Sequence, residues 1–263
     1  MRSKWCVPVA AFAIVGGAML ATTGASAATH STAKVTHTAV QPGGLARLTG
    51  GHGANAKTNA TSTNWSGYAV HGGTYKSVSA SWTEPTGHCS GSGDKYSSFW
   101  VGLDGYSTDS VEQTGSDTDC RGSTPVYYAW YEMYPAASVE INHPVKPGDK
   151  ISASVTFNGS GKFTLKLTDT TKGWTATENK TLASAKRGSA EVIIEAPCCT
   201  SSGGILPLAD FGTVHLTASK VDGSSIGSLS PTKITMVTSS GTSKDKISAL
   251  TGGTAFSGTW LHS

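Results

Sequence analysis

The sequence predicts an all-β fold in which two antiparallel sheets pack as a β-sandwich of the jelly-roll or concanavalin-like kind. From residue 64 onward, short runs of alternating apolar and polar residues recur, as in strands that turn one face to a core. Glycine is abundant, at 32 of 263 residues, and turn residues separate the runs. We find no amphipathic pattern long enough for a helix of three turns. Many short strands at close spacing are typical of two packed sheets.

Many strands are predicted from this alternation. Examples span residues 75–83, 96–104, 126–134, 150–158, 162–169, 189–195, 211–217 and 232–238. Glycine, Asn, Asp and Pro between them favour tight turns. The predicted turns are Gly72-Gly73, Pro147-Gly148-Asp149, Asn158-Gly159, Asp222-Gly223 and Gly252-Gly253. We expect residues 61–263 to form one domain, because no second change in composition follows residue 61.

The N-terminus has the order of segments found in secretory signal peptides. Arg2 and Lys4 precede an apolar run over residues 7–20, and small residues end the segment at Ala25-Ser26-Ala27. The apolar run is too short for a permanent membrane helix. We therefore expect cleavage after Ala27 and a secreted, extracellular protein that has no membrane association once the signal peptide is removed.

Residues 28–60 are interpreted as a flexible basic pro-segment or linker, because their apolar residues follow no sustained period. Five of the 20 basic residues precede residue 61 and all 17 acidic residues follow it. Residues 61–263 therefore carry 15 basic and 17 acidic residues, a net charge of −2. Such a domain lacks the cationic face that phosphate binding needs, which argues against a nucleic-acid partner. We expect a monomer.

The basic leader permits two hypotheses. It lies across an acidic cleft at neutral pH and is shed when carboxylates are protonated, or it is only a solvated linker.

Four cysteines remain once Cys6 is removed with the signal peptide, and an oxidising compartment favours disulfides between them. Three pairings are possible. The favoured one joins Cys89 to Cys120 and leaves Cys198 and Cys199 as a vicinal bridge. The spacing lacks the C-x-x-C pattern of a zinc site, so no metal is expected.

Alternation sorts the side chains of two predicted strands onto opposite faces. In strand 126–134 one face carries Tyr128, Trp130, Glu132 and Tyr134, which suits either a polymer-binding groove or a half-buried strand with a surface glutamate. In strand 189–195 one face carries Glu191, Ile193 and Glu195. From the residues alone, Glu195 is interpreted as a surface carboxylate at a strand end, since burying it unpaired is costly.

Familiar catalytic motifs are missing: the sequence has no H-E-x-x-H, no phosphate-binding loop and no dinucleotide fingerprint. Residues 223–227 match G-x-S-x-G, but their surroundings predict a hairpin loop rather than the strand, turn and helix that this motif requires. Asn64 and Asn158 begin patterns that fit glycosylation acceptors.

Four further blocks occur in a distinctive order. They read NWSGYA over 64–69, FWVGLDG over 99–105, EQTG over 112–115 with YAWYEMYP over 128–135, and AEVIIE over 190–195. In this order and spacing, residues 62–238 resemble the glutamic peptidases, or eqolisins, which are acid-active endopeptidases insensitive to pepstatin. The resemblance implies protein or peptide substrates, a β-sandwich and no cofactor.

The resemblance also assigns residues to roles. It implies that Gln113 and Glu195 are the catalytic pair and that Glu132 and Asp104 support them by hydrogen bonding. Residues implied to line the cleft are Trp65, Trp100, Trp130 and Tyr134, with Phe211 near it. In this chemistry Glu195 acts as general base and then general acid, and the Gln113 amide stabilises the oxyanion. Three departures from the family pattern, at Tyr128, Met133 and residues 196–199, affect the cleft walls more than the pair.

Two other functions fit the residues. The aromatic residues would stack on sugar rings in a secreted carbohydrate-binding module, and Glu132 with Glu195 would form the carboxylate pair of a glycoside hydrolase. Gln113 distinguishes the peptidase from these two alternatives, because neither of them gives it a role.

Overall fold

The computed structural model describes residues 59–198 and 204–263, and all of them fall within one compact unit of the chain. The predicted signal peptide, the leader up to residue 58 and Cys199 lie outside the described residues. Within the described part, no helix is long and apolar enough to cross a membrane.

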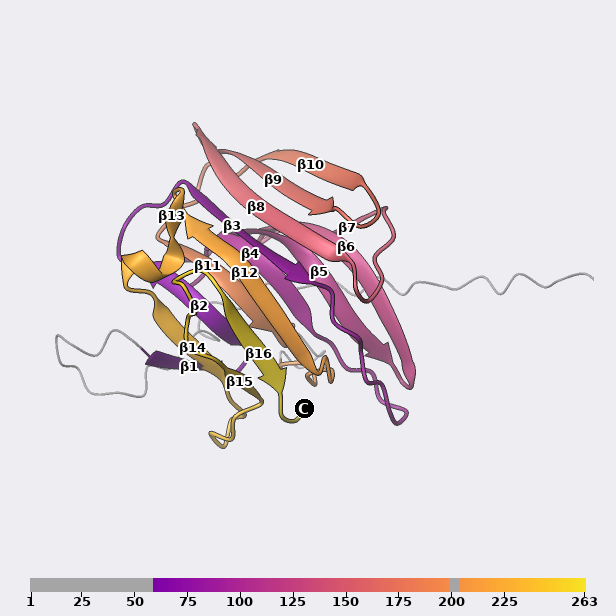
Figure 1. Ribbon diagram of the computed structural model, residues 1–263. Helices are drawn as coiled ribbons and strands as arrows, with labels where there is room; N and C mark the ends of the chain where they lie inside the picture. The colour runs from indigo at the N-terminus through magenta and orange to yellow at the C-terminus, as the bar shows by residue number, and fades with distance from the viewer. Residues whose placement is uncertain (1–58, 199–203) are drawn as a thin grey trace, which may run out of the picture. The chain divides into compact units, whose positions relative to one another are not determined.

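The first sheet has eight strands in the order β1-β14-β2-β11-β4-β5-β6-β7 (Figure 1). Neighbours are antiparallel except for the parallel pair β1 and β14. The bounds are β1 Asn59–Ser62, β2 Trp65–His71, β4 Ser98–Asp104, β5 Val111–Arg121, β6 Thr124–Tyr134, β7 Val139–Ile141, β11 Ser189–Glu195 and β14 Thr232–Met236.

The second sheet runs in the order β10-β9-β8-β3-β12-β16-β15, and β13 pairs with β12. Its strands are β3 Ser77–Thr83, β8 Lys150–Gly159, β9 Lys162–Asp169, β10 Trp174–Thr181, β12 Thr213–Val221, β13 Ser224–Ser225, β15 Asp245–Ile247 and β16 Phe256–Trp260. A 3-10 helix, Ile226–Leu229, follows β13.

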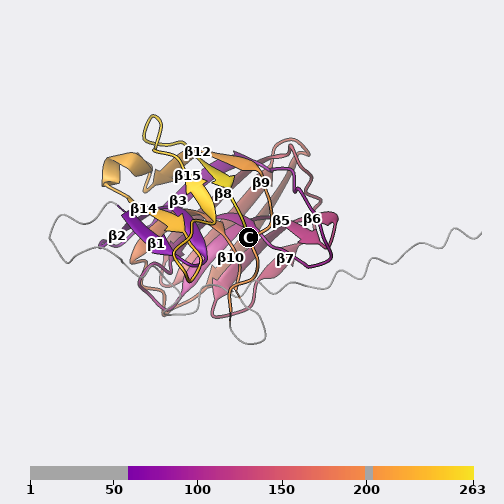
Figure 2. The ribbon, with the colours of Figure 1, turned by 90° about the horizontal axis from the view of Figure 1, so that it is seen from below.

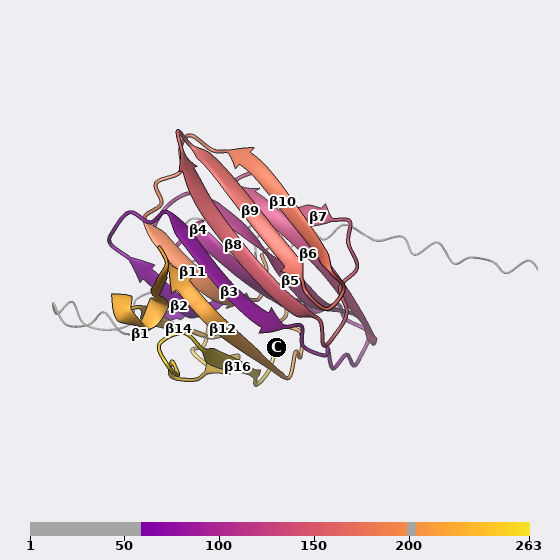
Figure 3. The same cartoon turned by 45° about the horizontal axis from the view of Figure 1, so that its top comes forward.

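The two sheets form separate layers of a sandwich, with β3, β8, β9 and β12 in front of β4 to β6 in Figure 3. At one end of the sandwich, β14 of the first sheet lies beside β15 of the second (Figure 2). Apolar side chains from both inner faces fill the space between the layers, for example Phe99, Val192, Phe163 and Leu216. The two-sheet all-β prediction is thus confirmed.

The alternation-based prediction located the strands best where one face is apolar. The predicted strands 162–169 and 189–195 coincide with β9 and β11. Among the strands that the prediction missed are β2 and β5, whose inward-facing positions include polar residues such as Ser66, Thr114 and Ser116. It also missed β10 and several shorter strands. Residues 223–227 form the predicted hairpin loop, a turn that leads into the 3-10 helix.

The disulfide between Cys89 and Cys120 is confirmed. Cys198 is also disulfide-bonded. The vicinal bridge to Cys199 remains a prediction, since Cys199 is not among the described residues.

Candidate functional site

The candidate site lies on the face of the first sheet that points away from the second sheet, called here the site face. Ala190, Val192 and Ile194 belong to the core between the sheets, so the intervening residues of β11 point to the site face. A second apolar cluster covers this face. It includes Trp65, Trp100, Trp130, Ile193 and Ile234, with Tyr128 and Tyr134 packed against it.

Strand register places Gln113 and Glu195 on this face, on either side of β4. Gly102 of β4 pairs with Glu191 of β11 on one side and with Gln113 of β5 on the other. Ser98, four residues earlier in β4, pairs with Glu195. Trp100 lies between these two positions of β4 and, two residues from each, points to the same face.

Two side chains hold the Glu195 carboxylate. The indole Nε1 of Trp100 donates to Oε2 at 2.8 Å, and Nδ2 of Asn64 donates to Oε1 at 3.3 Å. The Trp65 and Trp100 rings meet edge to face, with centroids 4.9 Å apart. Glu195 is therefore a buried carboxylate, 4% exposed and fixed by neutral donors. The interpretation of Glu195 as a surface residue, reached from the residues alone, is wrong.

Gln113 is oriented by Glu132, its cross-strand neighbour on β6. The Gln113 Nε2 atom donates to Glu132 Oε2 at 2.6 Å. Because a carboxylate oxygen only accepts, this contact requires the NH2 end of the amide to face Glu132. An amide nitrogen has two hydrogens, so one N–H remains for another acceptor. The structure thus brings Gln113 and Glu132 together, as the resemblance implies.

The aromatic residues of β6 border this arrangement. Trp130 and Tyr134 flank Glu132 on the site face, and the Trp130 Nε1 donates to Asp117 Oδ1 at 2.5 Å. The Tyr128 hydroxyl lies 2.9 Å from one carboxylate oxygen of Asp117 and from one of Asp119. The predicted cleft residues Trp65, Trp100, Trp130 and Tyr134 therefore share one face.

Within the part of the chain that the structure describes, Asp104 forms hydrogen bonds with a loop and not with the predicted catalytic residues. It accepts hydrogen bonds from the backbone amides of Lys186, Arg187 and Gly188 at 2.6 to 2.9 Å. These amides belong to the loop that leads into β11. Among the described residues Asp104 makes no hydrogen bond with Gln113 or Glu195, so any support it gives runs through the position of that loop.

Phe211 is not on the site face. It is 1% exposed and packs edge to face on Phe99 between the two sheets, with ring centroids 5.5 Å apart. The resemblance implied that Phe211 lies near the cleft, but the sequence did not reveal on which side of the sheet its side chain lies. We therefore leave Phe211 out of the candidate site.

Sequence reasoning gave no role to Asn64 or Asp117, which position Glu195 and Trp130. Asn64 lies in the first sequence block, but it was interpreted only as a glycosylation acceptor, and 1% exposure is incompatible with a glycan on the folded protein. The Asn64 and Glu195 contact joins residues 131 positions apart, which no local pattern signals.

Several carboxyl groups of the first sheet and its surroundings have raised pKa values. Burial raises the pKa of Glu191 well above its usual value, and nearby Asp104 and Glu112 add to this shift. Burial, then the charge of Asp104, raises the pKa of Glu112 to about 8. Burial also raises the pKa of Glu84 to about 8, against hydrogen bonds from Ser116, Thr118 and Trp82. These groups favour the neutral form in the folded protein.

The described residues contain no group of three or more His, Cys, Asp or Glu side chains placed to hold a metal ion.

Comparison with known proteins agrees with the arrangement of the site residues. Residues 63–259 match the model of the Peptidase A4 family. Scytalidopepsin B of Scytalidium lignicola is 35% identical over 195 residues, which cover 70% of this chain and 73% of that protein.

Solved structures show the same fold. Scytalido-glutamic peptidase with a transition state analog inhibitor superposes with a TM-score of 0.67 at 27% identity, covering 76% of this chain and 98% of that one. Aspergilloglutamic peptidase from Aspergillus niger gives 0.56 at 24% identity, over 64% of this chain and 99% of that one, and this likeness concerns the fold alone.

Proposed function

The chain belongs to the Peptidase A4 family of glutamic peptidases, and from this premise we propose that it is an endopeptidase in which Glu195 and Gln113 form the catalytic pair. One observation carries the proposal. The two side chains occupy one face of one sheet, and each is fixed by side-chain hydrogen bonds. A carbohydrate-binding module or a glycoside hydrolase offers no reason for an oriented Gln113.

In the first step Glu195 acts as general base. A water molecule attacks the carbonyl carbon of the scissile peptide bond and forms a new C–O bond, while its proton passes to the Glu195 carboxylate. Hydrogen bonds from Trp100 and Asn64 keep that carboxylate in one orientation. In the second step the protonated Glu195 gives its proton to the leaving nitrogen as the C–N bond breaks.

Gln113 stabilises the charge that develops on the carbonyl oxygen. Its second amide N–H donates to the oxyanion, and its first is bound to Glu132. An amide carries its hydrogens at any pH, so this donor works in acid. An oriented donor needs no reorganisation during the reaction, which is why such groups lower barriers.

These steps favour activity in acid. A glutamate has an ordinary pKa of about 4.3, so near pH 4 a catalytic glutamate exchanges its proton readily in both directions. The steps use only protein groups and water, and no pair of aspartates. We therefore expect neither a chelator nor pepstatin to inhibit cleavage.

Export and activation are part of the same proposal. The basic leader before residue 61 and the net charge of −2 after it favour attraction at neutral pH, which weakens as carboxylates are protonated. We expect cleavage after Ala27 and acid-dependent loss of the part of the leader that precedes β1. Mass spectrometry of the secreted protein tests both. A fully active product that retains the leader would exclude inhibition by it.

The catalytic pair is tested by substitution. Glu195→Gln and Gln113→Ala should each abolish cleavage of a denatured protein at about pH 4, while circular dichroism shows the fold unchanged. The matched control is Glu178→Gln, which alters a partly exposed glutamate on the edge strand β10 of the second sheet. Full activity in either site variant would refute the assignment.

A further inference from the structure

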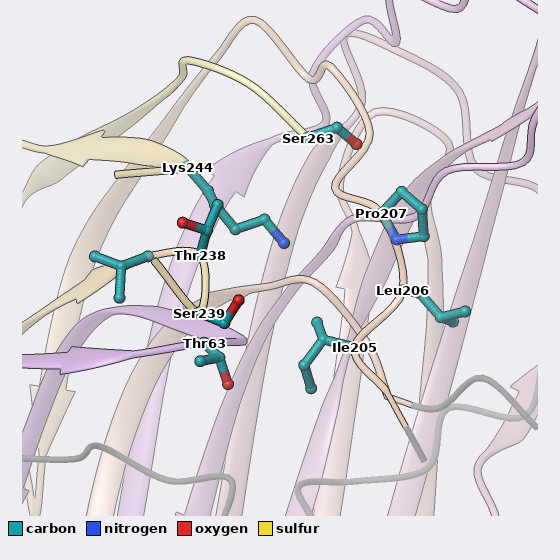
Figure 4. Close-up of a pocket in the computed structure, with 9 residues that line it drawn as sticks. Thr63, Ile205, Leu206, Pro207, Thr238, Ser239, Lys244 and Ser263 are labelled. Atoms are coloured by element: carbon teal, nitrogen blue, oxygen red, sulfur yellow. The ribbon is translucent and has the colours of Figure 1, made fainter. Parts of the chain in front are cut away.

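A separate cavity of about 490 Å³ lies at the end of the sandwich. Its lining residues are Thr63, Ile205, Leu206, Pro207, Val237, Thr238, Ser239, Lys244 and Ser263. In Figure 4 the Lys244 side chain extends between the Thr238 and Ser239 segment and the segment from Ile205 to Pro207. The walls are largely apolar, with hydroxyl groups and one amine. A volume of this size suits a side chain or a small ligand.

The cavity adjoins the candidate catalytic residues. Thr63 precedes Asn64, whose amide donates to Glu195 at 3.3 Å. On another wall, the backbone N–H of Leu206 donates to the carbonyl of Pro197, two residues beyond Glu195. The cavity and the general base are therefore built on the same chain segments.

Lys244 is unusual because, among the described residues, it is a buried cation without a counter-ion. It is 6% exposed, and within residues 59–198 and 204–263 no carboxylate lies at ion-pair distance from Nζ. The neighbouring Asp245 instead accepts a hydrogen bond from Ser66. Burial lowers the pKa of the Lys244 amine, and the charge of Asp245 opposes this only in part. An unpaired buried charge is costly, and an anion that enters the cavity removes that cost.

We propose that this cavity is a subsite for a peptide carboxylate, in which the Lys244 ammonium pairs with an acidic side chain or with a C-terminal carboxylate. The hydroxyl groups of Thr63 and Ser239, which also line the cavity, supply additional donors around the bound oxygens. The apolar wall of Ile205, Leu206 and Pro207 covers the methylene groups of the ligand. The subsite deepens the proposed function, since it rests on a peptide reaching Glu195.

A direct binding experiment separates the two sources of the carboxylate and does not depend on hydrolysis. Three probes are titrated calorimetrically at about pH 5.5: acetyl-Ala-Glu-amide, acetyl-Ala-Ala with a free C-terminus, and acetyl-Ala-Ala-amide. We expect at least one carboxylate probe to bind roughly tenfold more tightly than the neutral amide, as for a desolvated charge pair. The carboxylate probe that binds more tightly identifies whether the subsite takes an acidic side chain or a C-terminal carboxylate. Equal binding of all three probes overturns the subsite.

Substitution assigns the effect to Lys244. The preference should disappear in Lys244→Met, which keeps an unbranched side chain but removes the amine, and persist in Lys244→Arg, which keeps the charge. If the Met variant does not fold, Lys244→Gln replaces it. A carboxylate preference that survives loss of the amine contradicts the proposal.

Cleavage provides a second readout, from a pair of peptides that differ only in Glu or Gln at the position facing the subsite. The kcat/KM of the Glu peptide should be roughly ten times that of the Gln peptide at about pH 5.5. The two values should become similar at about pH 3, because the glutamate loses its charge near pH 4.3. If the probes bind but neither peptide is cleaved, the carboxylate site stands and the proposed peptidase mechanism fails. A pH-independent ratio overturns the role of charge.

Discussion

Strands β9 and β11 are similar in length, but β9 is buried mainly on one face and β11 on both. In β9, Phe163, Leu165 and Leu167 face the core while the residues between them are exposed or half-buried. In β11 every residue is buried, and the positions on the site face include Glu191 and Glu195. The second sheet thus supplies a conventional core face. The first sheet adds a second buried face, where carboxyl groups need hydrogen bonds or protons.

This difference indicates that the first sheet carries the proposed catalytic groups and that the second sheet mainly packs against it. Carboxyl groups in the first sheet are held by Trp100, Asn64 and Gln113 or have raised pKa values. Glu178 on β10, by contrast, makes an ion pair of 2.9 Å with Lys180 at the surface. Substitutions matched between the two sheets test whether this division holds.

After the catalytic pair itself, the largest effect is expected at Glu132. In Glu132→Ala the Gln113 amide loses its anchor, so its second N–H is no longer aimed at the oxyanion. We expect kcat to fall by about 10²-fold, as when an oxyanion donor is lost. Glu178→Gln in the second sheet should leave kcat unchanged. Steady-state kinetics on one peptide, with circular dichroism as a check of folding, provides the comparison. Equal kcat values for both variants would place Glu132 outside the mechanism.

The next effect concerns stability as a function of pH. Glu84 and Glu112 have folded-state pKa values of about 8, above the ordinary value of 4.5. The folded protein therefore binds more protons than the unfolded chain between these values, so stability is highest in acid and falls as pH rises from about 4.5 to 8. The free energy of unfolding should fall by up to about 5 kcal/mol for each group, because a pKa difference of one between the two states corresponds to about 1.4 kcal/mol and each pKa is raised from 4.5 to about 8.

Glu84→Gln tests the origin of that slope, because glutamine keeps the size but does not titrate. Urea unfolding from about pH 4 to pH 8 should give a flatter dependence in the variant than in the wild type. Glu178→Gln serves again as the control and should keep the wild-type slope. A variant slope equal to that of the wild type would show that Glu84 is already ionised in the folded state at neutral pH.

A smaller effect is expected at Gly102, which pairs with Gln113 across β4 and β5. A Cβ atom there would lie 2.8 Å from the Trp100 ring and 3.2 Å from Cβ of Gln113. Gly102→Ala should shift both side chains and lower kcat/KM roughly tenfold, since small misplacements are costly in catalysis. Gly93→Ala is the matched control, because a Cβ at Gly93 meets nothing within 4 Å. A Gly102→Ala enzyme with wild-type kinetics would show that Trp100 can move without consequence.

The smallest effect is expected at Lys244. Its folded-state pKa is lowered by burial, so the charged form destabilises the fold at all pH values below the folded pKa. Lys244→Met should raise the free energy of unfolding by about 1 kcal/mol at acid pH. The gain should shrink as the pH approaches 10.5 from below, where both states lose the proton. Thermal unfolding at two pH values measures it, and a destabilised Met variant would contradict the burial argument.

The sequence by itself determined the class of fold and about half of the strands in each sheet. Alternation in segments such as 162–169 is enforced by one core face, and turn residues such as Asp222-Gly223 mark where strands end. The cysteine count left three pairings open, and the structure shows the favoured disulfide between Cys89 and Cys120. Four short blocks sufficed to select Gln113, Glu132 and Glu195 as candidates.

Only the tertiary structure decided how those residues meet. Strand β5 escaped detection because Thr114 and Ser116 occupy inward positions, and Ser116 hydrogen-bonds there to buried Glu84. The contact from Asn64 to Glu195 and the cavity around Lys244 join segments far apart in the chain. The physical reason is that alternation records which face of a strand is buried, whereas strand order and register, set by long-range pairing, decide which side chains share that face.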